Sequence, residues 1–449
     1  MAADCLTFGA ASARLRAGEQ SPREFLEACL ARIDEREPSV RAFACLNAAG
    51  ARRAADEATK RYRKGKPLSS IDGMPIAIKD IIETEDMPTE FGSKVFKGWR
   101  GGRDAAVVFA LRQAGAIILG KAVTTEFAGA YPGPTRNPHD LKRTPGGSSS
   151  GSAAAVAAGM VPVALGTQVG GSILRPASFC GVIGFKPTFG ALNRGGSSDN
   201  FSQNVFGTLS HSLADAWAVC HEIALRVGGD PGFPAFAGGA APAAPRRPDV
   251  LAVLETAGWS LADAGAKKAF KTFLGKLAAA GIALVNRKTS DRVEQLERAI
   301  ADAGEVSQQI NDWEKLWPMA ELDHRAGAGL SEVLRKAIAA GRAMTPDRYT
   351  ALLRRRDVMR EMLCSLGPDV DACITLASPG PAPLGIQSTG NAIFNQPASA
   401  LRAPALSLPL MQVDGLPMGV QLIGYPLRER DLSAVAGFVL GLGANTTKA

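Results

Sequence analysis

The sequence is poor in histidine, and this scarcity excludes several kinds of site. Only four histidines occur in 449 residues (His139, His211, His221 and His324), and no two have the spacing of metal ligands on a helix. The seven cysteines are scattered and never form a C-x-x-C pair. We therefore expect neither a metal nor another cofactor, and we interpret the cysteines as thiols of a cytoplasmic protein.

Long apolar runs are also missing. Gly, Pro or charged residues interrupt every apolar run well before the roughly 18 residues that a membrane span needs. The first residues, M-A-A-D-C-L-T-F-G, do not place a basic segment before an apolar one, so no export signal is visible. These absences predict a soluble protein without a membrane partner.

A concentrated basic segment is absent despite a formal net charge of +8. The densest basic runs, 61–66 and 354–356, are short and fall in or beside predicted helices, which favours solvated faces. The run G-A-I-I-L-G-K-A (115–122) approximates a phosphate-binding loop, but Ala122 replaces the metal-binding hydroxyl and the preceding residues are strand-like. We expect no nucleic-acid partner; a non-catalytic nucleotide- or nucleic-acid-binding protein is the weakest alternative.

What the chain does contain is an alternation of helical and strand patterns, which is typical of an α/β fold. We divide residues 1–449, as a single domain, into a helical layer (1–65), a core (66–227), a mostly helical variable region (228–370) and C-terminal strands with a final helix (371–449). Apolar runs predict strands at 161–165, 250–254, 283–285, 372–376, 405–409 and 419–423.

The stretch from Thr144 to Gly190 organises the core. It contains two Gly/Ser loops, 146–152 and 167–172, with an Ala-rich helical segment and an apolar strand-like segment between them. The first loop precedes a helix and the second follows a strand, and in an α/β layer those two ends lie on the same side of the sheet. Ser148 and Ser172 can therefore meet.

A serine nucleophile needs a base. Gly147–Gly151 matches G-x-S-x-G, but no strand precedes it, so Ser149 is a poor candidate for a nucleophile. Lys79 lies instead in an apolar run, between Ile78 and Ile81. A lysine with the ordinary pKa of about 10.4 becomes a base near neutral pH only if burial lowers that pKa by roughly three units.

These residues identify a resemblance to the amidase signature family. It is carried by G-M-P-I-A-I-K-D (73–80), G-K-A-V-T-T-E-F-A (120–128), T-R-N-P-H-D (135–140), G-G-S-S-S-G-S-A-A-A-V-A-A-G (146–159), G-T-Q-V-G-G-S-I-L-R-P-A-S (166–178), C-G-V-I-G-F-K-P-T-F-G (180–190), P-A-L-S-L-P (404–409) and G-L-P-M-G-V-Q-L-I-G (415–424). Only about 230–370 has no match. The resemblance implies a central mixed β-sheet covered by helices on both faces.

The resemblance also implies a Ser-cisSer-Lys triad. Ser172 is similar in position to the family's nucleophile, Ser148 to the bridging serine after a cis peptide bond, and Lys79 to the base. The implied reaction is acyl transfer, with the oxyanion held by backbone N–H groups. The candidates for that oxyanion hole are Val169, Gly170 and Gly171, together with Ser172 itself.

The chain departs from the family pattern at two positions beside the nucleophile. Gln168 stands where the family has Asp, and Leu174 stands where it has Arg. We hypothesise that the acid and base were lost together, with Arg175 covering part of their role. We expect these changes to affect substrate preference more than activity.

We predict an amidohydrolase acting on small, apolar or aryl amides, with carbamates (urethanes) as further substrates and esters as an open side activity. The predicted pocket is closed by the variable region and the loop 129–134, and it includes Tyr131, Gln168 and Phe394. The first alternative is an amidotransferase subunit that supplies ammonia to a tRNA-dependent partner. A small amide or carbamate is the expected partner, and a homodimer is left open.

Overall fold

A large mixed sheet forms the centre of the molecule. The computed structural model describes residues 5–197, 201–326 and 329–444. Within these ranges eleven strands form one sheet in the order β1-β3-β2-β4-β6-β5-β10-β11-β9-β7-β8. The strands are β1 (Phe43–Leu46), β2 (Pro75–Lys79), β3 (Ile117–Ala122), β4 (Val163–Gln168), β5 (Ile183–Lys186), β6 (Val205–Ser210), β7 (Val250–Val253), β8 (Ala283–Val285), β9 (Ala372–Leu376), β10 (Ala405–Val413) and β11 (Leu416–Ile423).

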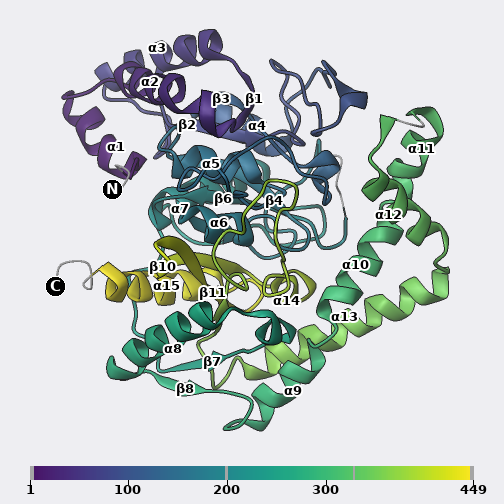
Figure 1. Cartoon of the computed structure of the whole chain (residues 1–449). Helices are drawn as coiled ribbons and strands as arrows, with labels where there is room; N and C mark the ends of the chain where they lie inside the picture. Colours follow the sequence, from purple (N-terminus) through teal and green to yellow (C-terminus); the bar gives the residue numbers. More distant parts are fainter. Residues whose placement is uncertain (1–4, 198–200, 327–328, 445–449) are drawn as a thin grey trace.

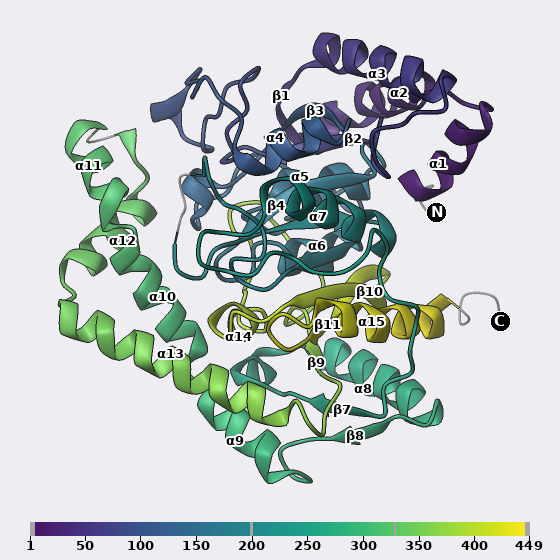
Figure 2. The same cartoon turned by 180° about the vertical axis from the view of Figure 1, so that it is seen from behind.

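Helices flank this sheet, as the fold class predicted (Figure 1). They are α1 (Phe8–Ala17), α2 (Pro22–Val40), α3 (Ala48–Arg63), α4 (Ala106–Gln113), α5 (Ser150–Ala157), α6 (Leu174–Cys180), α7 (Leu213–Val227), α8 (Ala264–Ala279), α9 (Asp291–Ala299), α10 (Ala303–Glu314), α11 (Leu316–Ala326), α12 (Glu332–Arg342), α13 (Pro346–Leu366), α14 (Gln396–Ala400) and α15 (Glu429–Ala444). Short 3₁₀ turns lie at Lys94–Phe96, Glu126–Ala128 and Ala257–Leu261. Helices α10 to α12 run along one side of the molecule in both views (Figures 1 and 2).

Local signals in the sequence explain several of these boundaries. At the start of α2, Ser21 and Glu24 form a reciprocal capping box, with Pro22 as the first helical residue. Strand β4 begins two residues after the predicted start and continues through Gln168. The run 115–122 places Gly120 and Lys121 inside the buried strand β3, so this segment is not a phosphate-binding loop.

Three strands were missed or placed in other structure by the sequence analysis. The segment 1–65 supplies α1 to α3 but also β1, which pairs with β3 at the edge of the sheet. Strands β5 and β6 lie in the middle of the sheet, but neither is among the strands predicted from apolar runs. Their glycines and polar residues hide the apolar pattern, because both faces of the strands are covered by other parts of the chain.

Helix α5 is packed unusually close to the sheet, and this explains its composition. All eight of its residues, Ser150–Ala157, are buried. A Cβ atom at Gly151 would overlap the backbone oxygen of Ala42 and the backbone nitrogen of Val123. Small residues therefore let α5 approach β3 and set the position of the loop that carries Ser148.

Candidate active site

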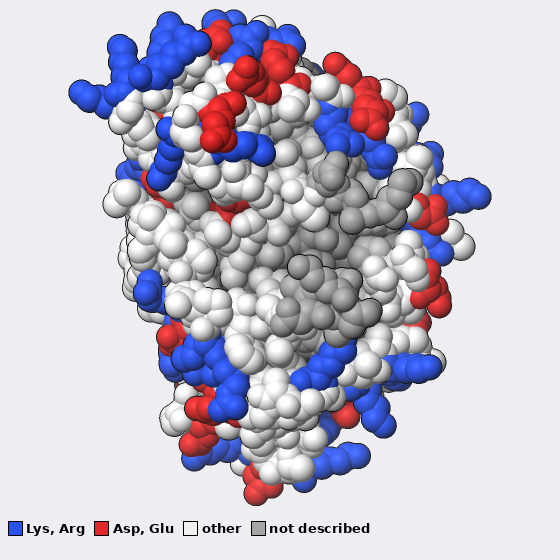
Figure 3. Space-filling model, turned by 90° about the vertical axis from the view of Figure 1, so that its left-hand side faces the viewer, with Lys and Arg blue, Asp and Glu red and all other residues white. Residues whose placement is uncertain are grey.

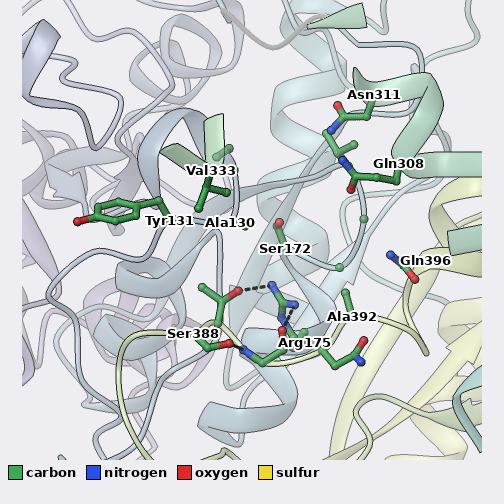
Figure 4. Close-up of a pocket in the computed structure, with 18 of the residues that line it drawn as sticks. Ala130, Tyr131, Ser172, Arg175, Gln308, Asn311, Val333, Ser388, Ala392 and Gln396 are labelled. Carbon is green, nitrogen blue, oxygen red and sulfur yellow. Dashed lines mark hydrogen bonds between the residues drawn. The ribbon is translucent and has the colours of Figure 1, made fainter. Parts of the chain in front are cut away.

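A cavity of about 1030 Å³ lies between the sheet and helices α10 and α12. Most of its remaining walls come from the segments 128–131, 169–172, 379–384 and 388–392. Ser172 lines the cavity and is partly exposed to it. Figure 4 shows Ser172 between Gln308 and Asn311 on one side and Arg175 on the other. The variable region thus contributes two helices to the wall facing Ser172.

Lys79 and Ser148 are in direct contact at the end of β2. The Nζ atom of Lys79 lies 2.7 Å from Ser148 Oγ, and both side chains are buried. The peptide bond between Gly147 and Ser148 is cis, as the resemblance predicted. The backbone N–H of Ser149 donates to the carbonyl oxygen of Ser172 at 3.3 Å. The two Gly/Ser loops therefore meet, although they are separated along the chain by α5 and β4.

Thr167 is a further contact of Lys79 that sequence analysis missed. Its Oγ1 atom lies 2.8 Å from Lys79 Nζ, and its carbonyl oxygen lies 3.4 Å away. Thr167 was assigned to a loop, but it belongs to β4, which runs parallel to β2. The pairing of Ile78 with Leu165 places the ends of both strands together, and the sequence alone carries no signal for that pairing.

The segment 169–172 presents several unused backbone donors. Over the described residues, no protein acceptor is found for the N–H groups of Val169, Gly170, Gly171 and Ser172. Gly171 is tightly enclosed, because a Cβ atom there would lie 2.8 Å from both Ala392 Cβ and Asn395 Oδ1. These unpaired donors lie beside the hydroxyl group of Ser172.

Gln168 holds the loop after β4 in place through hydrogen bonds, although it does not line the cavity. Its Oε1 accepts hydrogen bonds from the N–H groups of Ile173 and Leu174, at 2.9 and 3.0 Å. Its Nε2 donates to the Gly170 carbonyl and to Ser399 Oγ, at 3.3 and 3.0 Å. An amide serves here because it can accept at one end and donate at the other, whereas a carboxylate can only accept.

Arg175, which the sequence analysis proposed to cover part of the role of a lost acid–base pair, bonds two backbone carbonyl groups near Ser148. Arg175 donates to the carbonyl oxygens of Gly147 and Gly390, at 2.6 and 2.8 Å, and does not contact Gln168. Burial lowers the pKa of Arg175 to about 10. Leu174 is fully buried in an apolar cluster. Arg175 therefore holds the peptide that precedes Ser148.

The three pocket residues predicted from the sequence have different positions. Tyr131 lines the cavity, but its side chain is 53% exposed and points away from Ser172 (Figure 4). Gln168 and Phe394 do not line the cavity. Gln168 is occupied by the bonds described above, and the Phe394 ring is buried next to Gly258, where a Cβ atom would lie 2.8 Å from it. These two assignments are corrected to supporting positions.

The described residues contain no group of three or more His, Cys, Asp or Glu side chains that could hold a metal ion. Within the same part of the chain, no helix is both long and apolar enough to cross a membrane. On the face drawn in Figure 3, the described Lys and Arg side chains are interspersed with Asp and Glu. The described residues of this face therefore form no continuous basic surface.

Comparison with known proteins places this geometry in a family. The family model described as Amidase matches residues 24–432. The chain is 35% identical to a protein of Chloroflexus aggregans (strain MD-66 / DSM 9485) that is named as the A subunit of glutamyl-tRNA(Gln) amidotransferase, over 96% of this chain and 95% of that protein.

Solved structures agree with that match. A crystal structure of an amidase superimposes with a TM-score of 0.85 at 28% identity and covers 97% of this chain and 99% of its own. The structure of a 6-aminohexanoate cyclic dimer hydrolase complexed with substrate gives a TM-score of 0.82 at 26% identity, with 97% of each chain covered. The chain therefore belongs to the amidase family and is an amidase-type hydrolase of C–N bonds.

Proposed function

We propose that this protein hydrolyses small amides through an acyl-enzyme on Ser172, with Ser148 and Lys79 as the proton relay. The observation that carries the proposal is the 2.7 Å contact between Lys79 Nζ and Ser148 Oγ, next to a serine at the wall of a large cavity. Burial disfavours the charged form of an amine, and only the neutral form can accept a proton.

Ser172, Ser148 and Lys79 together provide every proton transfer that the reaction needs. Ser172 Oγ bonds to the amide carbon while its proton passes to Ser148 Oγ, and the Ser148 proton passes to Lys79 Nζ. The relay then returns a proton to the substrate nitrogen as the C–N bond breaks, which releases the amine and leaves an ester on Ser172. Water, deprotonated by the same relay, attacks that ester and releases the carboxylic acid.

The unpaired N–H groups of 169–172 support an oxyanion hole in this mechanism. The Gly170 carbonyl oxygen accepts from Gln168 and from Ser399, the latter at 2.8 Å. The C=O of Gly170 and the N–H of Gly171 share one trans peptide plane and point in opposite directions. Fixing the carbonyl therefore fixes the N–H, and one such donor is worth about 3 kcal/mol in the transition state.

Replacement of Ser172 tests the proposal directly. Ser172→Ala is expected to lower kcat by at least about 10⁴-fold and to abolish the acyl-enzyme seen by mass spectrometry after rapid quenching. Ser388→Ala is the matched control, because Ser388 lines the same cavity but bonds only the backbone N–H of Gly390 among the contacts described. Full activity of Ser172→Ala would contradict the mechanism.

We further propose that aryl amides and aryl carbamates are among the substrates. The support is the apolar part of the cavity lining, to which α12 contributes Val333, Leu334 and Ala337 and the segment after β9 contributes Pro379 and Pro381. A rate panel of anilides, carbamates and esters with one common acyl group tests this. Equal rates for aryl and alkyl members would contradict an aryl preference.

A second candidate function is that of an amidotransferase subunit, favoured by the 35% identity over 96% of the chain to a protein of that name. Such a subunit would release ammonia from an amide donor for use by partner chains. The purified single chain should then be slow on simple amides. Rapid hydrolysis of those amides without any partner would instead support the first proposal.

A further inference from the structure

The wall opposite Ser172 carries a row of polar side chains that the proposed reaction does not use. Ser307, Gln308 and Asn311 line the cavity from α10, where Asn311 lies three positions after Gln308 and four after Ser307, the spacings that bring side chains together on a helix. Gln203, from the segment before β6, lines the same part of the cavity. Figure 4 shows Gln308 and Asn311 on the wall facing Ser172.

The donor ends of the two glutamines are already occupied. Gln203 Nε2 donates to the carbonyl oxygen of Ser307 at 2.9 Å. Gln308 Nε2 donates to Asp312 Oδ1 at 2.7 Å. These contacts fix which end of each amide is used, and they leave the two carbonyl oxygens as acceptors.

Three buried atoms of this wall have no partner within the described residues: Gln203 Oε1, Ser307 Oγ and Asn311 Oδ1. The residues that carry them are only 1%, 3% and 8% exposed, respectively. Buried polar atoms are almost always hydrogen-bonded, and an orphaned atom beside a cavity calls for a ligand or water partner. Gln203 Oε1 and Gln308 Oε1 can only accept, and the Ser307 hydroxyl oxygen can also accept, so this part of the wall is complementary to a group that donates hydrogen bonds.

Charge indicates that this donor is neutral. The acidic residues that line the cavity are Glu126, Asp263 and Asp312, and the basic ones are Arg175, Lys315 and Lys336. Burial raises the pKa of Asp312, and the positive charge of Lys315 and the hydrogen bond from Gln308 oppose this effect in part. The acceptors therefore do not stand in a strongly negative field that would select a cation.

We infer that the α10 wall is a second substrate subsite, which selects amides whose non-reacting end carries another uncharged N–H donor, such as a second carboxamide. This inference rests on the proposed reaction at Ser172 and adds the substrate class. The cavity volume of about 1030 Å³ leaves room for such a substrate, because pockets for small molecules commonly measure roughly 300–1,000 Å³.

A matched pair of substrates isolates the N–H donor. Adipamide and 6-oxoheptanamide have the same length and differ only by NH₂ or CH₃ at the far carbonyl group. We expect kcat/KM for adipamide to be at least about tenfold higher, beyond the statistical factor of about two for its two identical ends. The cationic 6-aminohexanamide is expected to be slower than adipamide.

Substitutions on α10 test whether its side chains cause the preference for adipamide. Gln308→Met and Asn311→Leu should each lower the ratio of kcat/KM for adipamide to kcat/KM for 6-oxoheptanamide by about fivefold or more. Gln309→Met is the matched control. Gln309 is the next residue along the helix, and its amide instead bonds Glu305 and Arg348.

The outcomes separate this inference from the proposed function. Equal kcat/KM for adipamide and 6-oxoheptanamide, or faster hydrolysis of the cationic amide, would overturn the subsite while hydrolysis through Ser172 stood. Unchanged selectivity in both α10 variants would overturn it as well. If no amide were hydrolysed and no acyl-enzyme formed, both the subsite and the proposed function would fail.

Discussion

Thr167 contacts the candidate base, Lys79, and was not predicted from the sequence. Its hydroxyl group is the second polar side-chain contact of Lys79 Nζ, at 2.8 Å, and Thr167 does not line the cavity. Thr167→Val should lower kcat about tenfold and leave KM unchanged, because the lysine loses a partner that orients it while the substrate contacts remain. Steady-state kinetics measure both values.

Thr167→Ser provides the control for that prediction, because it retains the hydroxyl group. Its kcat should return to within about threefold of the original value. A variant Thr167→Val with unchanged kcat, or a rise in KM alone, would show that the contact does not orient the base.

Because Lys186 is buried, we expect the stability of the protein to depend on pH. It is buried and donates to the carbonyl oxygen of Ala403 at 2.6 Å, and burial lowers its pKa to about 7, although Glu429 opposes the change. The unfolded value is about 10.4, so between these pH values the unfolded chain binds a proton that the folded chain does not. The destabilising effect is complete below pH 7 and disappears toward pH 10.4.

The variant Lys186→Met removes this linkage. The free energy of unfolding of the original protein, minus that of the variant, should rise by about 3 kcal/mol between pH 7 and pH 10. Urea titrations at several pH values measure the difference, and effects of the buried cysteines cancel between the two proteins. A difference that did not change with pH would contradict the lowered pKa.

Some residue positions could be predicted from the sequence, and others could not. The positions of Lys79, Ser148 and Ser172 could be predicted because their motifs are local and the resemblance is specific. The orientation of Gln168 and Phe394 could not, because each depends on contacts with segments more than a hundred residues away, such as Ser399 and Gly258. A pattern along the chain carries no information on such partners.

At the scale of elements, the apolar strands were the easiest to predict. Strand β9 lies at Ala372–Leu376, as expected, because five buried apolar or small residues are bounded by turn signals. Strand β1 has only four residues and alternates between partly buried and exposed positions, so it escaped between two helices. Strand β5 contains Gly184 and the buried Lys186, whose fit depends on the neighbouring strand β10.

Gly170 and Gly171 are neighbours in the loop between β4 and α6, and we expect their replacement by alanine to have different effects on stability and activity. A Cβ atom at Gly171 would meet Asn395, whose Nδ2 already donates to Ala377 O and Gln421 Oε1, at 2.9 and 2.8 Å. Gly171→Ala should therefore shift the loop, lower kcat about 100-fold and reduce the free energy of unfolding by about 1–3 kcal/mol. Kinetics and denaturant titration test both effects.

Gly170→Ala is the control within the same loop. A Cβ atom there has Gln396 Cγ as its nearest neighbour, at 4.0 Å, so stability should change by no more than about 0.5 kcal/mol. Equal losses of stability in the two variants would mean that steric contact with Asn395 does not explain the need for glycine.

At the scale of the whole molecule, the site is assembled from both ends of the chain. The triad candidates all lie between residues 79 and 172, but the segment 169–172 is braced by Ser399, and Arg175 is held by Gly390. The sheet joins the two parts, because β10 pairs with β5 through Ala405 and Lys186. The N-terminal part therefore contains the triad candidates without all the contacts that hold them in place.

This arrangement predicts the behaviour of a divided chain. The segment around Ala240 is largely exposed, so the chain can be cut between Ala240 and Ala241. Fragment 1–240 alone should lack amidase activity, since β5 would keep β6 but become an exposed edge strand without β10, and Gln168 would lose Ser399. Co-refolding with fragment 241–449 should restore at least about a tenth of the intact rate.

A protease site placed at the same position and cleaved after folding is the control, and it should leave the rate unchanged. Activity of fragment 1–240 by itself would show that the C-terminal strands do not hold the site together.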